Sequence, residues 1–255
     1  MRRLVNAALA AALLTFVAGP AGPAARVPVV VELFTSEGCS DCPPADALLA
    51  ELDRTQPVPG VLVIPLEEHV DYWDHQGWRD PFSSHAFTDR QEHYVRRLDL
   101  ATAYTPQMVV DGRSDLVGSA SKQAHAAIEA AAHAPHVEMT LTLAAPEAGP
   151  LRATIRTAAP PGEINEGTDL WLAVTEDGLG SKVAAGENAG RSLEHRAVVR
   201  ALTTQGHVAR GETLSTAVDL RIAPTWKREN LRVVVFVSGE TTGRVYGAAT
   251  ARVTP

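Results

Sequence analysis

Two cysteines, Cys39 and Cys42, constrain the fold of this 255-residue chain more than any other feature. They follow an apolar, β-branched segment at residues 28–34, which predicts a buried strand, and they precede Pro43, which suits the first turn of a helix. A Cys-x-x-Cys pair at such a junction is a redox motif, because its spacing permits a disulfide and a helix N-terminus stabilises the attacking thiolate. An inert structural disulfide and half of a metal site are the alternative interpretations of the same spacing.

The first half of the chain alternates between helical and strand patterns. Apolar residues recur on one helical face over residues 45–52, and the apolar run 61–64 predicts a second buried strand, parallel to the first. A strand at 108–110, an Asp-Gly turn, a return strand and a helix over 121–133 follow. These patterns predict an α/β domain.

From Val137 onward the pattern is almost wholly period two, which is typical of half-buried antiparallel strands. Seven expected strands in about 119 residues predict an all-β sandwich. The seam lies at residues 134–136, where an Ala-rich helical stretch meets a proline. The expected organisation is therefore an α/β domain over residues 25–135 followed by a β-sandwich over 136–255.

The first 24 residues have the features of a signal peptide. Arg2 and Arg3 precede a 12-residue apolar run broken only by Thr15, and small residues lead to a cleavage site after Ala24. We therefore expect the protein to be exported to the periplasm or the extracellular space, where disulfides persist. No later apolar run approaches the ~20 residues of a membrane helix, so we expect no membrane span in the mature chain. The net charge of −7 argues against nucleic acid as a partner.

Five segments, taken together, resemble a known family. They lie at residues 31–46, 69–74, 77–82, 104–112 and 186–195. This set is similar to an exported thioredoxin-like family catalogued as domain of unknown function 1223. The resemblance implies a thioredoxin-like fold for the first half, with Thr105-Pro106 in a cis-proline loop lying against the cysteine pair and helping to form a substrate groove. It implies no established substrate, and we expect no cofactor.

The cysteine motif departs from that of thioredoxin itself, which keeps Gly-Pro between its cysteines where this chain has Ser40-Asp41. Because Pro43 disfavours an α conformation at Cys42, we expect the helix to begin after the second cysteine. Glu37 and Asp41 add negative charge, which should oppose a low thiol pKa.

His69 is the leading candidate for tuning the cysteines. It follows the carboxyl end of the second predicted strand as Cys39 follows that of the first, so we expect the two residues within about 10 Å on the same rim of the sheet. If the strand continues, Asp71 and Trp73 share a face with His69. The alternative interpretation is that these residues only hold the following polar, helical insertion against the domain.

Three hypotheses for the function follow. In the first, the protein is a thiol-disulfide oxidoreductase of cell-envelope proteins, with Cys39 as the attacking thiolate and Cys42 as the resolving thiol. In the second, it handles copper(I) with Cys39, Cys42 and His69, since soft thiolates favour that ion. In the third, it is a binding module with an inert disulfide.

Overall fold

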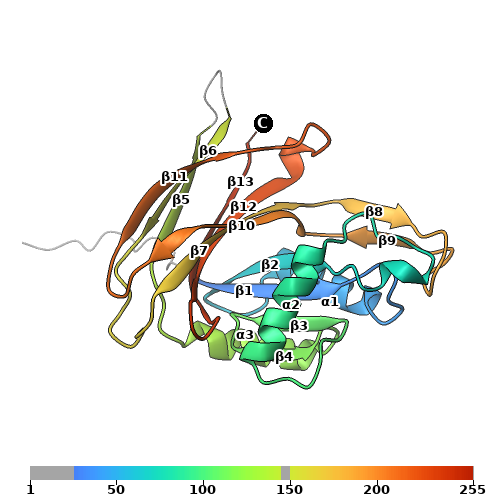
Figure 1. Ribbon diagram of the computed structural model, residues 1–255, viewed down its shortest axis with the longest axis horizontal. Helices are drawn as coiled ribbons and strands as arrows, with labels where there is room; N and C mark the ends of the chain where they lie inside the picture. The colour runs from blue at the N-terminus through green and yellow to red at the C-terminus, as the bar shows by residue number, and fades with distance from the viewer. Residues whose placement is uncertain (1–25, 145–149, 255) are drawn as a thin grey trace, which may run out of the picture.

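The computed structural model describes residues 26–144 and 150–254, so the expected signal peptide lies outside the described residues. Within them the chain is mixed α/β, mostly sheet with few helices, as Figure 1 shows. The helices are α1 (Pro43–Thr55), α2 (His85–Arg97) and α3 (Ser121–Ala132), with 3-10 turns η1 (Asp74–Gln76) and η2 (Arg228–Asn230). The strands are β1 (Val27–Thr35), β2 (Val61–His69), β3 (Gln107–Val110), β4 (Ser114–Val117), β5 (Met139–Ala144), β6 (Leu151–Thr157), β7 (Thr168–Glu176), β8 (Leu179–Lys182), β9 (Ser192–His195), β10 (Val198–Val208), β11 (Leu214–Leu220), β12 (Leu231–Gly239) and β13 (Val245–Arg252).

The first half forms the predicted α/β unit. Strands β1 and β2 are parallel, and β3 and β4 add antiparallel strands beside β1. Helices α1 and α3 cover one face through a core that includes Val31, Leu49 and Ile128, whereas α2 lies on the other face, where Phe87 packs beside Ile64. The expected parallel pair with a helix after the cysteines is therefore confirmed.

The two halves share one sheet rather than forming separate layers. Eight strands run in the order β13-β12-β7-β10-β2-β1-β3-β4, and the two halves meet where β10 pairs with β2 in parallel at Val198 and Glu67. Ala173 and Phe236 of the second half pack in the same core cluster as Val30 of the first. The chain crosses from α3 to β5 near the seam that the sequence predicts, but a continuous sheet spans that seam.

A second, three-stranded sheet, β11-β6-β5, packs against β7 and β12 of the large sheet. Its inward side chains include Ala153 and Ile155, which meet Leu172 and Val235. The second half therefore has the two packed sheets of a sandwich, with one of them extended into the first half. The hairpin of β8 and β9 is a separate small sheet that contacts α1.

Two local expectations change in the structure. Strand β2 runs to His69, five residues beyond the predicted run 61–64, and Glu67 and His69 are buried there with His195 and Asp80 as partners. Helix α1 does begin at Pro43, but Cys42 takes an α conformation (φ −76°, ψ −39°) despite the proline that follows it. Its carbonyl accepts from the backbone N–H groups of Ala45 and Asp46, which supports that conformation.

Candidate functional site

The cysteine loop lies between the carboxyl end of β1 and the first turn of α1. Cys39 and Cys42 form a disulfide with their Cα atoms 5.5 Å apart. Cys39 is 2% exposed and Cys42 is fully buried, whereas Ser40 and Asp41 between them are exposed. The pair therefore lies under a surface loop, with Cys39 as the slightly more accessible residue.

Trp73 connects this loop to the proline loop. Its Cβ packs so closely on Gly38 that a Cβ at position 38 would come within 3.0 Å of it. Its indole Nε1 donates to Thr105 Oγ1 at 2.8 Å, and the Thr105-Pro106 peptide is cis, as the sequence predicts. Trp73 thus ties the proline loop to the residue that precedes Cys39.

A loop from the second half covers the cysteine loop. The buried Asn188 donates from Nδ2 to the carbonyls of Glu37 and Cys39, each at 2.9 Å. Beside it, the exposed Glu187 accepts from the Ser40 N–H at 3.0 Å. Nothing in the local sequence pattern identifies the Cys39 carbonyl as the partner of Asn188.

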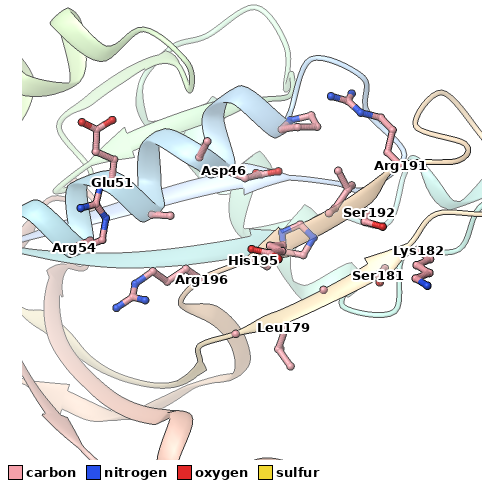
Figure 2. Close-up of a pocket in the computed structure, with 17 residues that line it drawn as sticks. Asp46, Glu51, Arg54, Leu179, Ser181, Lys182, Arg191, Ser192, His195 and Arg196 are labelled. Atoms are coloured by element: carbon pink, nitrogen blue, oxygen red, sulfur yellow. The ribbon is translucent and has the colours of Figure 1, made fainter.

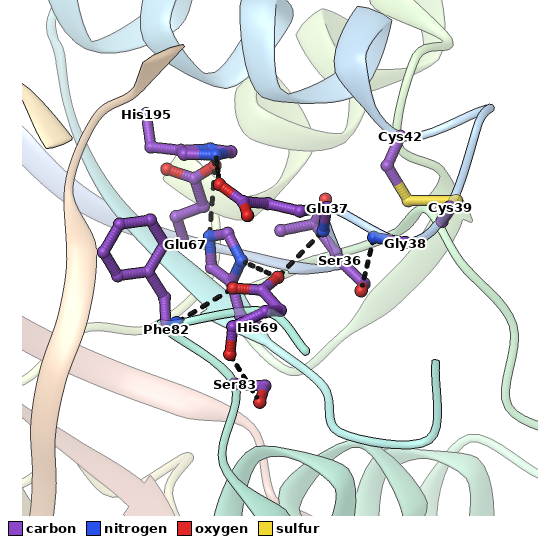
Figure 3. Close-up of polar contacts among 12 residues, drawn as sticks. Ser36, Glu37, Gly38, Cys39, Cys42, Glu67, His69, Phe82, Ser83 and His195 are labelled. Atoms are coloured by element: carbon purple, nitrogen blue, oxygen red, sulfur yellow. Dashed lines mark hydrogen bonds and ion pairs between the residues drawn. A yellow bond between two sulfur atoms is a disulfide. The ribbon is translucent and has the colours of Figure 1, made fainter. Parts of the chain in front are cut away.

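His69 lies at the same end of the sheet as the disulfide, and a polar path joins the two (Figure 3). Its Nδ1 is 2.7 Å from Asp80 Oδ2, and the same carboxylate oxygen accepts from the Glu37 N–H at 2.8 Å. Burial lowers the pKa of His69, but the carboxylates of Asp80 and Glu67 outweigh it and raise that pKa well above its usual range. His69 therefore reaches the cysteine loop through Asp80, with its ring nitrogens directed at carboxylates rather than at sulfur.

His195, from the end of β9, packs edge-on against His69 with 4.7 Å between ring centroids. Its Nδ1 is 2.8 Å from Glu67 Oε1, and its Nε2 is 3.1 Å from Glu37 Oε1. Burial lowers the pKa of His195, but Glu67 and Glu37 raise it to about 9 in spite of the neighbouring His69. We call Glu37, Glu67, His69, Asp80 and His195 the polar cluster.

The carboxylates of Glu37 and Asp71 have partners other than the cysteines. The Glu37 carboxylate does not face the sulfurs, because it accepts from Trp78 Nε1 at 2.8 Å and from His195. Asp71 turns to the start of α2, where it accepts from Thr88 Oγ1 at 2.6 Å, and so belongs to the anchoring of the insertion.

The sequence pattern does not mark Glu67 or Asp80 as site residues, and it includes His195 only as the end of the segment 186–195. One signal was present: Glu67 and Glu68 directly continue an apolar strand run, where an unpaired charge would be costly. Their partners lie far along the chain, since His195 is 128 positions from Glu67, and a pattern read along the sequence does not connect them.

The polar cluster borders a groove between α1 and the β8–β9 hairpin, with a cavity volume of about 1090 Å³ (Figure 2). Asp46 of α1 and His195 of β9 both line it. Burial and the neighbouring Glu67 raise the pKa of Asp46 to about 7. The groove therefore reaches the polar cluster at His195, whose side chain is itself buried.

Comparison with known proteins agrees with this architecture. The chain aligns with a crystal structure of an Agrobacterium tumefaciens protein from a structural genomics consortium, with a TM-score of 0.73 and 24% identity over 90% of this chain and 96% of that one. It also aligns with HBP35 of Porphyromonas gingivalis, with a TM-score of 0.63 and 16% identity over 89% of this chain and 76% of that one. At such identities these likenesses concern the fold alone.

No curated protein matches the sequence. Residues 30–238, which include every residue of the polar cluster and both cysteines, match the family described as protein of unknown function, DUF1223. The resemblance noted from the sequence motifs is thereby confirmed, and the chain belongs to the DUF1223 family.

Proposed function

We propose that the protein is a thiol-disulfide oxidoreductase of the cell envelope, built on a thioredoxin-like first half, with Cys39 and Cys42 as its redox couple. The observation that carries this proposal is the position of the pair. The disulfide precedes the first turn of α1, and Trp73 joins its loop to a cis-proline loop. A helix N-terminus offers unpaired N–H groups and a positive dipole end, which favour a thiolate.

The reaction is a two-electron exchange. In the reduced protein the Cys39 thiolate attacks one sulfur of a partner disulfide, forming a mixed disulfide and releasing the first partner thiolate. The Cys42 thiolate then attacks Cys39, which releases the second partner thiolate and leaves the Cys39–Cys42 disulfide. The protein dithiol loses two electrons and two protons, and the partner disulfide gains both.

Access favours Cys39 as the attacking residue. Cys39 is the more exposed of the two, and its neighbours Ser40 and Asp41 are at the surface. On the other side of the same residue, the Cys39 carbonyl is covered by Asn188. The partner in this proposal is an envelope protein, and export by the expected signal peptide places the chain where such disulfides form.

The test is an equilibrium titration of the mature chain against reduced and oxidised glutathione, followed by alkylation of free thiols. A potential between about −120 and −270 mV, the range of known thiol-disulfide catalysts, is the expected result. Cys42→Ser should trap mixed disulfides with partner proteins, and Cys39→Ser should not. A potential below about −300 mV, together with no trapping by Cys42→Ser, would show an inert structural disulfide instead.

A further inference from the structure

The polar cluster has a feature that redox chemistry at the cysteines does not use. Ligand atoms of Glu67, His69 and His195 all lie within 4.8 Å of one another, and all three residues are buried. Two of them come from the end of β2 and the third from β9, so the continuous fold brings together groups from both halves. Figure 3 shows both imidazoles turned toward the Glu67 carboxylate.

His69 provides an independent observation. Its Nδ1 is held by Asp80, whereas its Nε2 has no hydrogen-bond partner among the residues that the structure describes. That nitrogen is fully buried and faces Glu67 Oε1 at 3.6 Å. A buried imidazole nitrogen without a hydrogen bond is costly unless something else binds it.

Both histidines have the arrangement of metal ligands. A metal-bound imidazole almost always gives its second ring nitrogen to a carboxylate or carbonyl, which sets its orientation and tautomer. Here Asp80 takes that place for His69 and Glu37 takes it for His195. Each ring then presents its other nitrogen to Glu67, at 3.6 Å and 2.8 Å.

We propose that Glu67, His69 and His195 bind a divalent transition-metal ion of the zinc class, with Asp80 and Glu37 as the carboxylates that orient the two imidazoles. Two imidazoles and one carboxylate suit zinc or ferrous iron, whereas calcium and magnesium take oxygen ligands and copper(I) favours thiolates. Three protein donors leave a fourth position free for water or a small molecule.

The groove supplies the route of entry. His195 lines it, and Asp46 stands beside His195 on the wall formed by α1 (Figure 2). An ion that enters through the groove reaches His195 first. Neither cysteine lines this groove, so the cysteine loop does not have to open for the ion to enter. Because no sulfur is a donor, the site is independent of the redox function proposed above.

The test uses the mature chain without a histidine tag and with its disulfide intact. Zinc is added in competition with a chromogenic zinc chelator, and the expected result is one ion retained per chain. Glu67→Gln and His195→Gln should abolish retention, and Asp80→Asn should weaken it ~10–100-fold, as expected for a carboxylate that orients a ligand. His85→Gln, at an exposed histidine, is the matched control and should bind as the unaltered chain does.

Cobalt(II) in the unaltered chain gives a readout that needs no variant to fold. We expect absorption bands of a four- or five-coordinate cobalt ion, without a sulfur-to-cobalt charge-transfer band. As a separate check, a chain that carries both Cys39→Ser and Cys42→Ser should give the same bands. A sulfur band, zinc retention that survives both Glu67→Gln and His195→Gln, or no retention by the unaltered chain would each overturn the proposal.

Discussion

Asn188 is the residue through which the second half contacts the cysteine loop at two backbone carbonyls. Its amide nitrogen serves two carbonyls, those of Glu37 and Cys39, in a region without solvent. Removing this amide leaves the Glu37 carbonyl without that donor and leaves the Cys39 carbonyl with only the Cys42 N–H at 3.3 Å, a loss that costs about 1–3 kcal/mol. The same contact also keeps the backbone at Cys39 covered.

We expect Asn188→Ala to lower the free energy of unfolding by about 1–3 kcal/mol and to speed reduction of the Cys39–Cys42 disulfide by dithiothreitol. Urea unfolding and thiol release over time measure the two effects. Glu187→Ala, which removes an exposed contact to the same loop, is the control and should change both quantities little. An unchanged reduction rate in Asn188→Ala would mean that this loop does not control access to the disulfide.

Asp111 shows how one buried carboxyl shapes the response to pH. It sits in the turn after β3 with φ +46°, is 2% exposed, and accepts from the Val30 N–H at 2.7 Å. Burial raises the pKa of Asp111 to about 7 against the hydrogen bond and the nearby Arg113, which lower it. Since the folded pKa exceeds the unfolded one, the stability that this group gives is full below about pH 3.8 and is lost as the pH rises through about 7.

Asp111→Asn should therefore match the unaltered chain near pH 3 and exceed it in stability near pH 9, by roughly 4 kcal/mol at one pKa unit per 1.36 kcal/mol. Asparagine keeps an acceptor for Val30 and tolerates a positive φ. Asp99→Asn, at an exposed aspartate with φ +53°, is the matched control for backbone effects. Equal gains at both pH values would show that ionisation of Asp111 is not the cause.

At the scale of elements, α1 is bound to the second half by a buried ion pair. Arg232 of β12 donates to both carboxylate oxygens of Asp53, at 2.8 and 3.1 Å, and Arg196 donates to the same group. Burial raises the pKa of Asp53, but the two arginines outweigh it and hold that pKa below its usual range. These ion pairs hold α1, the helix that follows the cysteines, against the strands of the second half.

Arg232→Met should destabilise the chain by about 3–5 kcal/mol, because it leaves Asp53 short of charge compensation in a buried place. The double variant Asp53→Leu with Arg232→Met should recover most of that loss in urea unfolding. Arg152→Ala, which breaks an exposed pair with Asp219, is the control and should leave stability unchanged within error. If the double variant is no more stable than Arg232→Met, the loss does not come from an uncompensated Asp53 carboxylate.

Local patterns in the sequence predict the elements of the first half well. The parallel β1–β2 pair and the helix at Pro43 follow from short-range signals, whereas the cis peptide at Pro106 was implied by the family resemblance. The β8–β9 hairpin was not predicted, because its strands have four residues each and lie where glycine and charged residues interrupt the alternation. The polar cluster is not predicted for another reason: His195 pairs with Glu67 and Glu37 across more than a hundred positions.

On the scale of the whole molecule, one sheet runs through both halves. A single parallel bridge joins β10 to β2, and the side chains on either side share a core. Without the second half, the edge of β2 and apolar residues such as Val30, Ile64 and Leu66 would lose their cover. The sequence does not predict the shared sheet. The hydrophobic pattern changes from mixed to period two in the same way whether the two halves form separate sheets or one continuous sheet.

The shared sheet predicts that the mature chain unfolds in one cooperative transition. A fragment of residues 26–135 should lack a sharp urea transition and should bind a hydrophobic dye, since it exposes an unpaired strand edge and part of its core. Circular dichroism and dye fluorescence are the measurements. A fragment with its own sharp transition would establish the two separate domains that the sequence predicts.

No helix among the described residues is long and apolar enough to cross a membrane.

The pairing of His195 with Glu67 and Glu37 spans 128 and 158 positions, and this has a consequence for the order of synthesis. The N-terminal half of a chain emerges first and begins to fold first. Both cysteines and Glu67 are then available long before His195, so a truncated or stalled chain can close its disulfide while its carboxylates stay uncompensated. The disulfide can therefore close before the polar cluster is complete, because His195 reaches Glu37 and Glu67 only after the last third of the chain has begun to emerge.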